Sequence, residues 1–203
     1  MTMVKKYSIL ILLLTLVAGC GHAVKHTVST EHYRLKPHTV ALLPVVWKGD
    51  AKEAEKNEVS LVFNDMVAEK VRLLGYAVTV VDEDDARAAD AATTPPAELA
   101  RRFGAETVMY SSITGWDTDQ LVTYAALTLR ARFNLYSANG SELWKAEHTS
   151  KKSDLRLDKR PMEIAIIDAW EPKVQRFIDI VFATLPRSET PAGAQEKYFD
   201  WLP

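Results

Sequence analysis

The sequence is poor in the residues from which most reactive sites are made. Cys20 is the only cysteine among 203 residues, which excludes an intrachain disulfide and a thiolate cluster that could hold structural zinc or an iron–sulfur centre. Lysine and arginine (25) do not outnumber aspartate and glutamate (27), so the basic excess typical of nucleic-acid-binding proteins is missing. The composition therefore favours no cofactor, no metal and no nucleic-acid partner.

Glycine-rich phosphate loops are also missing. The first apolar strand pattern is followed by Lys48-Gly49-Asp50, with a single glycine, so neither a P-loop nor a dinucleotide fingerprint is present. There is no Gly-x-Ser-x-Gly elbow. The uncharged stretch from Tyr7 to Gly19 is short for ~30 Å of hydrocarbon at ~1.5 Å per residue, which argues against a permanent transmembrane helix.

What is present begins at the amino terminus. Lys5 and Lys6 precede an apolar run from Ile9 to Ala18, the layout of a secretory signal. Val17-Ala18-Gly19-Cys20 resembles the lipobox of bacterial lipoproteins, which predicts a signal peptide over 1–19 and acylation, including palmitate, at Cys20. The alternative is an ordinary signal peptide with an incidental cysteine.

An acylated Cys20 implies permanent membrane attachment, since each buried methylene contributes ~0.8 kcal/mol. The next residue is Gly21, not the aspartate that retains such proteins in the inner membrane, so we expect the outer membrane, facing the periplasm. Residues 20–37 are polar and without a regular period, which predicts a lipidated tether. Four histidines lie at 22, 26, 32 and 38, but with no helix signal and no carboxylate pair beside them we favour a solvated linker over a metal site.

We predict that residues 38–186 form a single α/β domain. Thr39–Trp47 is an apolar strand pattern interrupted near Pro44, and an amphipathic helix follows from Glu53 to Gly75. Further strand and helix patterns alternate along the chain, which predicts a mixed sheet whose first strands are parallel. These segments are the strand 76–81, the helix 97–103 closed by Gly104, and the strand 106–113.

The second half changes pattern. Apolar residues alternate with polar ones from Leu121 to Tyr136, and Asn139-Gly140 predicts a hairpin turn into a returning strand over 142–149. A helical stretch over 161–185 contains Pro172, which predicts a kink or break, and residues 187–203 form a tail with an aromatic cluster over 198–202. The tail cluster either docks on its own domain or anchors a partner.

Few side chains suggest chemistry. Ser111 and Ser112 end a predicted strand, and His148 is the only histidine beyond His38, so a hydrolytic site would need these residues. Asp117 and Asp119 fit a turn better than an acid–base pair, and the acidic run 82–85 fits a helix start better than a cation site. We therefore predict no catalytic residues.

The motifs "TVALLPV", "LLGYAVTVVD", "FGAETVMYSSITGW" and "LYSANGSELW", together with the lipobox, resemble the GNA-type bacterial lipoprotein family of unknown function. That family is described as having a fold like the amino-terminal domain of TolB, and the layout is distantly similar to the curli secretion lipoprotein CsgG and to LpoB. The resemblance implies a helix-flanked, three-layer-like α/β fold, no catalytic residues, and self-association.

The resulting hypothesis is an outer-membrane lipoprotein that acts as a non-catalytic assembly or protein-binding component of an envelope or transport complex. Its partners would be the membrane, an unidentified envelope protein and further copies of the chain. The alternative is a periplasmic ligand-binding or hydrolytic protein with a site at the carboxyl ends of the sheet strands.

Overall fold

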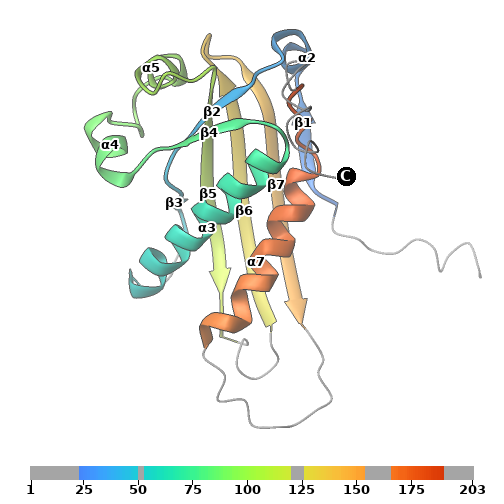
Figure 1. Ribbon diagram of the computed structural model, residues 1–203. Coiled ribbons are helices and arrows are strands. Elements are labelled where there is room, and N and C mark those ends of the chain that lie inside the picture. Colours follow the sequence, from blue (N-terminus) through green and yellow to red (C-terminus); the bar gives the residue numbers. More distant parts are fainter. Residues whose placement is uncertain (1–22, 50–52, 120–125, 154–165, 190–203) are drawn as a thin grey trace, which may run out of the picture.

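The computed structural model describes residues 23–49, 53–119, 126–153 and 166–189 (Figure 1). In these segments a seven-stranded sheet is flanked by helices. The strands are β1 (Lys25–Val28), β2 (Thr39–Leu42), β3 (Val46–Trp47), β4 (Ala77–Val80), β5 (Thr107–Asp117), β6 (Ala126–Ser137) and β7 (Glu142–Ser153). The helices are α2 (Thr30–Leu35), α3 (Glu53–Leu73), α4 (Glu83–Ala88), α5 (Pro96–Arg102) and α7 (Ile166–Phe182).

The sheet is mixed, as the sequence predicts. Its strand order is β1-β7-β6-β5-β2-β4, and β3 pairs separately with β5. The pairs β2–β4, β2–β5 and β3–β5 are parallel, whereas β5–β6, β6–β7 and β1–β7 are antiparallel. The predicted strand around Pro44 is divided there into β2 and β3, because proline has no N–H to donate to the ladder. The predicted fold class is confirmed.

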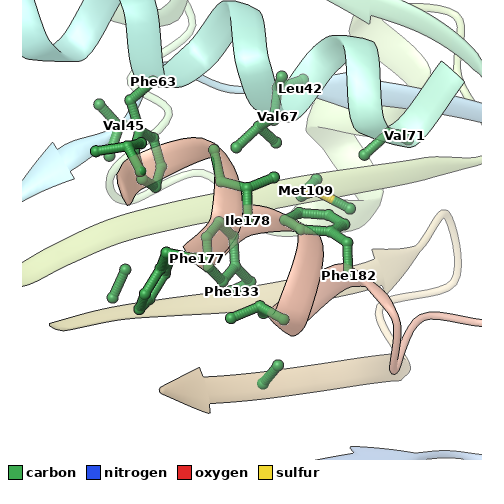
Figure 2. Close-up of a cluster of buried hydrophobic side chains, with 14 of the residues drawn as sticks. Leu42, Val45, Phe63, Val67, Val71, Met109, Phe133, Phe177, Ile178 and Phe182 are labelled. Carbon is green, nitrogen blue, oxygen red and sulfur yellow. The ribbon is translucent and has the colours of Figure 1, made fainter. Parts of the chain in front are cut away.

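One face of the sheet is covered by α3 and α7, which cross it side by side (Figure 1). The main core lies beneath them, where Phe133 of β6 stacks on Phe63 of α3 and meets Phe182 of α7 edge-on, with ring centroids 5.9 and 5.0 Å apart (Figure 2). Lys70 of α3 also donates to Asp179 of α7 at 2.6 Å. α7 runs through Pro172 without ending there, so the break that this proline predicts is not observed.

The opposite face is covered only in part. Leu99 and Ala100 of α5 pack against Ala41 and Val108 on β2 and β5, with Ala89 just beyond α4 in the same cluster. From Thr128 to Tyr136 on β6 and from Lys145 to Lys151 on β7, by contrast, the side chains that point to this face are exposed or half-buried. On this face the sheet is therefore covered over β2 and β5 and uncovered over β6 and β7.

The predicted tether is wrong for most of its length. Lys25–Val28 forms β1, which pairs with Trp144–Glu147 of β7, and Thr30–Leu35 forms α2, where the Ser29 hydroxyl caps the amino terminus by accepting from the Glu31 N–H at 3.2 Å. A four-residue edge strand and a six-residue helix are too short to show a hydrophobic period, which is why the sequence reads as a linker. Residues 25–35 therefore belong to the folded domain.

Candidate functional site

Two of the sequence predictions fall outside the described residues. Cys20 and the aromatic cluster over 198–202 both lie there, as does His22. Within the part that is described, no helix is long and apolar enough to cross a membrane.

The remaining amino-terminal histidines have three separate environments. His26 is exposed on β1, and its Nδ1 lies 3.2 Å from the carbonyl oxygen of Val24, two residues earlier in the chain. His32 is buried on α2, with Nε2 3.0 Å from the hydroxyl of Tyr76, which itself donates to the Pro186 carbonyl at 2.8 Å. Because a carbonyl can only accept, the Tyr76 proton goes to Pro186 and His32 Nε2 must be the donor to Tyr76.

His38 binds the same carboxyl-terminal segment. Its Nδ1 lies 2.9 Å from the Ser188 hydroxyl, which donates to the Pro37 carbonyl at 2.9 Å, and the Ser188 N–H donates to Leu74 at 2.9 Å. His32, through Tyr76, and His38 therefore stabilise the segment that follows α7. No group of metal-ligating side chains occurs among the described residues.

The residues considered for hydrolysis do not form a site. Ser111 is buried on the core face of β5 without a hydrogen-bond partner, and Ser112 points to the other face. His148 is buried on β7 with its ring 5.2 Å from that of Phe177. β6 lies between β5 and β7, so Ser111 and His148 are two strand spacings apart, about 9–10 Å, beyond proton-transfer reach.

The acidic residues have the local roles that the sequence predicts. Asp117 accepts the Asp119 N–H at 3.0 Å, the bond of a turn-forming aspartate. Asp82 caps α4 by accepting the Asp85 N–H at 2.6 Å, and the other acidic residues of the run lie in the first turn of that helix. Both Asp117 and Asp82 thus accept a backbone N–H from a nearby residue in the chain.

The open side of the sheet carries a cluster of cations that the fold assembles from three strands. Residues that pair across strands share a face, and the pairs Lys25–Glu147, Glu147–Arg132 and Arg132–Ser112 form one continuous row. We call the surface formed by five cations on β1, β6 and β7 the basic face; its members are Lys25, Arg130, Arg132, Lys145 and Lys151.

Hydrogen bonds and one ion pair link side chains across the strands of this surface. Arg132 pairs with Glu147 at 3.1 Å, and Arg130 Nε donates to Thr149 at 3.1 Å. Near the hairpin, Glu142 accepts from Asn134 at 2.9 Å and from Tyr136 at 3.2 Å. Burial, followed by the nearby Glu142 carboxylate, raises the pKa of Tyr136, so this hydroxyl stays protonated and donating.

An acidic run lies at the opposite end of the sheet. α4, with the acidic run 82–85, lies on the left in Figure 1, and β1 lies on the right. β4, whose residues are Ala77, Val78, Thr79 and Val80, is the edge strand on the α4 side. The two edges of the sheet are thus chemically different.

Sequence reasoning missed the basic face as a unit. The alternation along 126–136 places Arg130 and Arg132 on one side of a strand, and that signal is visible in the sequence. The contribution of Lys25 is not, because it depends on β1 pairing with β7, more than a hundred residues away.

Solved structures of other proteins are similar to this chain. The PelC dodecamer from Paraburkholderia phytofirmans superposes with a TM-score of 0.54 at 16% identity, covering 82% of this chain and 99% of that chain. A variant PelC dodecamer gives 0.51 at 16% identity over 79% and 96% of the two chains. Lipoprotein GNA1162 from Neisseria meningitidis gives 0.48 at 18% identity over 70% and 99%. No family model and no curated protein matches the sequence, so the two PelC likenesses establish the fold alone.

Proposed function

We propose that this chain is a lipoprotein, anchored through Cys20 in the outer membrane and facing the periplasm, which acts as a non-catalytic assembly component of an envelope or transport complex. The lipobox-like Val17-Ala18-Gly19-Cys20 supports the anchor, and Gly21 supports outer-membrane sorting. The fold shared with PelC, whose solved structures are dodecamers, supports assembly from copies of the chain.

The observation that carries the assembly role is the exposed edge at β4. Ala77 N–H donates to His38 and Val81 N–H donates to Leu42, so the alternate N–H groups of Val78 and Val80 point away from the sheet. Natural edge strands are commonly protected by charge, proline or a bulge, and β4 contains no charged residue and no proline. Val80 is 43% exposed. Such an edge suits pairing with another chain.

The experiment starts from protein extracted from membranes in detergent, with and without prior crosslinking of the cells. We expect an amino-terminal peptide that begins at acylated Cys20, and native masses that are multiples of the monomer. Cys20→Ser should abolish both acylation and recovery in the membrane fraction. An unacylated wild-type protein would contradict the anchor, whereas an acylated protein recovered only as a free monomer would contradict the assembly role.

A further inference from the structure

We propose that the basic face lies against the anionic headgroups of the membrane that holds the anchor. This inference rests on the proposed acylation of Cys20. It adds an orientation: the outer side of β1, β7 and β6 faces the lipid, while α3 and α7, which cover the other side of the sheet, face away.

The first argument is the length of chain between the anchor and the fold. β1 begins at Lys25, five residues after Cys20. At no more than ~3.6 Å per residue, this stretch spans at most about 18 Å. The headgroup region of a bilayer is about 5–8 Å thick on each side, so the β1 edge lies at or near the lipid surface. A tether that ended at residue 37 would have allowed far more distance.

The second argument is the charge next to that edge. Lys25 on β1 itself, and Lys145 and Lys151 on the adjoining strand, are exposed. Arg130 is exposed on the next strand inward, whereas Arg132 is neutralised by Glu147. In the described part of the chain, none of the four exposed cations makes an ion pair, so their charges are available to a partner. Near an anionic surface each lysine strengthens binding about fivefold.

The third argument is the uneven distribution of charge over the domain. The acidic run 82–85 lies beside the sheet edge opposite to β1 (Figure 1). This run lies on the same face of the sheet as the basic face, because α4 and α5 cover the β2 and β5 part of it. An anionic surface therefore attracts the β1 side of this face and repels its α4 side, which tilts the domain so that β1, β7 and β6 lie nearest the lipid, even though the chain as a whole has a formal charge of -2. A membrane is the partner we favour because the anchor fixes it next to these cations.

The test uses the full acylated protein inserted into vesicles of phosphatidylcholine alone, or of phosphatidylcholine mixed with phosphatidylglycerol. A water-soluble amine-acylating reagent is added, and the labelling rate of each lysine is read by peptide mass spectrometry. We expect Lys25, Lys145 and Lys151 to react about fivefold more slowly on the anionic vesicles, with the difference removed by high salt. Lys70, on α3 across the sheet, should react equally on both.

Charge reversal provides the matched comparison. In Lys145→Glu/Lys151→Glu, the protection of Lys25 by anionic lipid should disappear, whereas Arg72→Glu/Arg176→Glu reverses two exposed cations on the helical side and should leave it unchanged. Circular dichroism and thermal unfolding confirm that each variant is folded. Unchanged Lys25 protection in the first variant would overturn the proposal.

Other outcomes separate this inference from the proposed function. Equal labelling of the three lysines on both vesicle types, with the protein bound to both, overturns the orientation and leaves the anchor intact. Protection by a soluble acidic polysaccharide but not by phosphatidylglycerol also overturns it and points to a polymer partner. Failure of the wild type to attach to either vesicle refutes the anchor, and with it the orientation.

Discussion

His32 and Tyr76 form a buried contact that joins both ends of the described chain. Tyr76 follows α3, its hydroxyl receives the Nε2 proton of His32, and it donates its own proton to Pro186 after α7. Burial raises the pKa of Tyr76 well above its ordinary value, so the phenol remains a donor at all physiological pH values. The Tyr76 hydroxyl therefore links α2 to the segment that follows α7.

The same contact predicts a pH dependence of stability. Burial lowers the pKa of His32 below the ~6.5 of an unfolded chain. Below about pH 6.5 the unfolded chain binds a proton at His32 that the folded chain does not. The contribution of His32 to the free energy of unfolding therefore falls as the pH falls toward the lowered pKa, by at most ~1.4 kcal/mol per pH unit. Above about pH 6.5 this contribution is constant.

Urea unfolding between about pH 7.5 and 5 measures this effect. The stability advantage of the wild type over His32→Gln should shrink as the pH falls. An unchanging difference between wild type and His32→Gln would show that His32 does not titrate differently in the folded state.

Among the strands, the backbone that follows β3 passes very close to β5. Lys48 N–H donates to the Ile113 carbonyl at 2.8 Å, and the register of β5 against β6 shifts just beyond, between Ile113 and Gly115. A Cβ at Gly49 would lie 2.9 Å from the Thr114 carbonyl oxygen. Only a residue without a side chain lets these backbones pass.

Gly49→Ala should therefore destabilise the domain by about 1–3 kcal/mol, because backbone atoms of β5 would have to move. Lys48→Ala, at the exposed neighbouring position, should stay within about 0.5 kcal/mol of wild type. Both values come from denaturant unfolding. Equal stabilities for the two variants would mean that β5 relaxes at little cost.

At the scale of the whole molecule, the sheet has two unlike edges and two unlike faces. A closed ring of identical subunits joins two different surfaces of each copy, whereas a two-fold dimer joins the same surface twice. Here the uncharged β4 edge and the β1 edge with its lysine are on opposite sides of the sheet. This arrangement is compatible with head-to-tail assembly.

Val80→Lys tests whether β4 is an assembly surface. A lysine at this exposed edge position would have to be desolvated when another strand pairs there, so we expect the native mass of the acylated protein to fall toward the monomer. Val46→Lys introduces the same charge at a valine that is 53% exposed on β3, and should leave the mass unchanged. If both variants assemble as the wild type does, β4 is not the contact.

Much of the core architecture could be predicted because its signals are local and long. The helical period sustained over the 21 residues of α3, the apolar strand before Pro44 and the Asn139-Gly140 turn each give enough residues to identify a helix, a strand or a hairpin. β1 and α2 give too few, and their structure depends on the distant β7 and Tyr76. For the same reason the sequence does not show that Ser111 and His148 are apart, because their separation depends on β6 pairing between β5 and β7.

Composition and local patterns are enough to identify the candidate anchor at Cys20, the absence of thiol clusters and phosphate loops, most strands and helices of the core, and a formal charge of -2. How that charge is distributed over the surface depends on the fold. Strand pairing brings Lys25 beside residues 145–151 and leaves 82–85 at the other edge, because which residues share a face depends on register between distant segments rather than on their order along the chain.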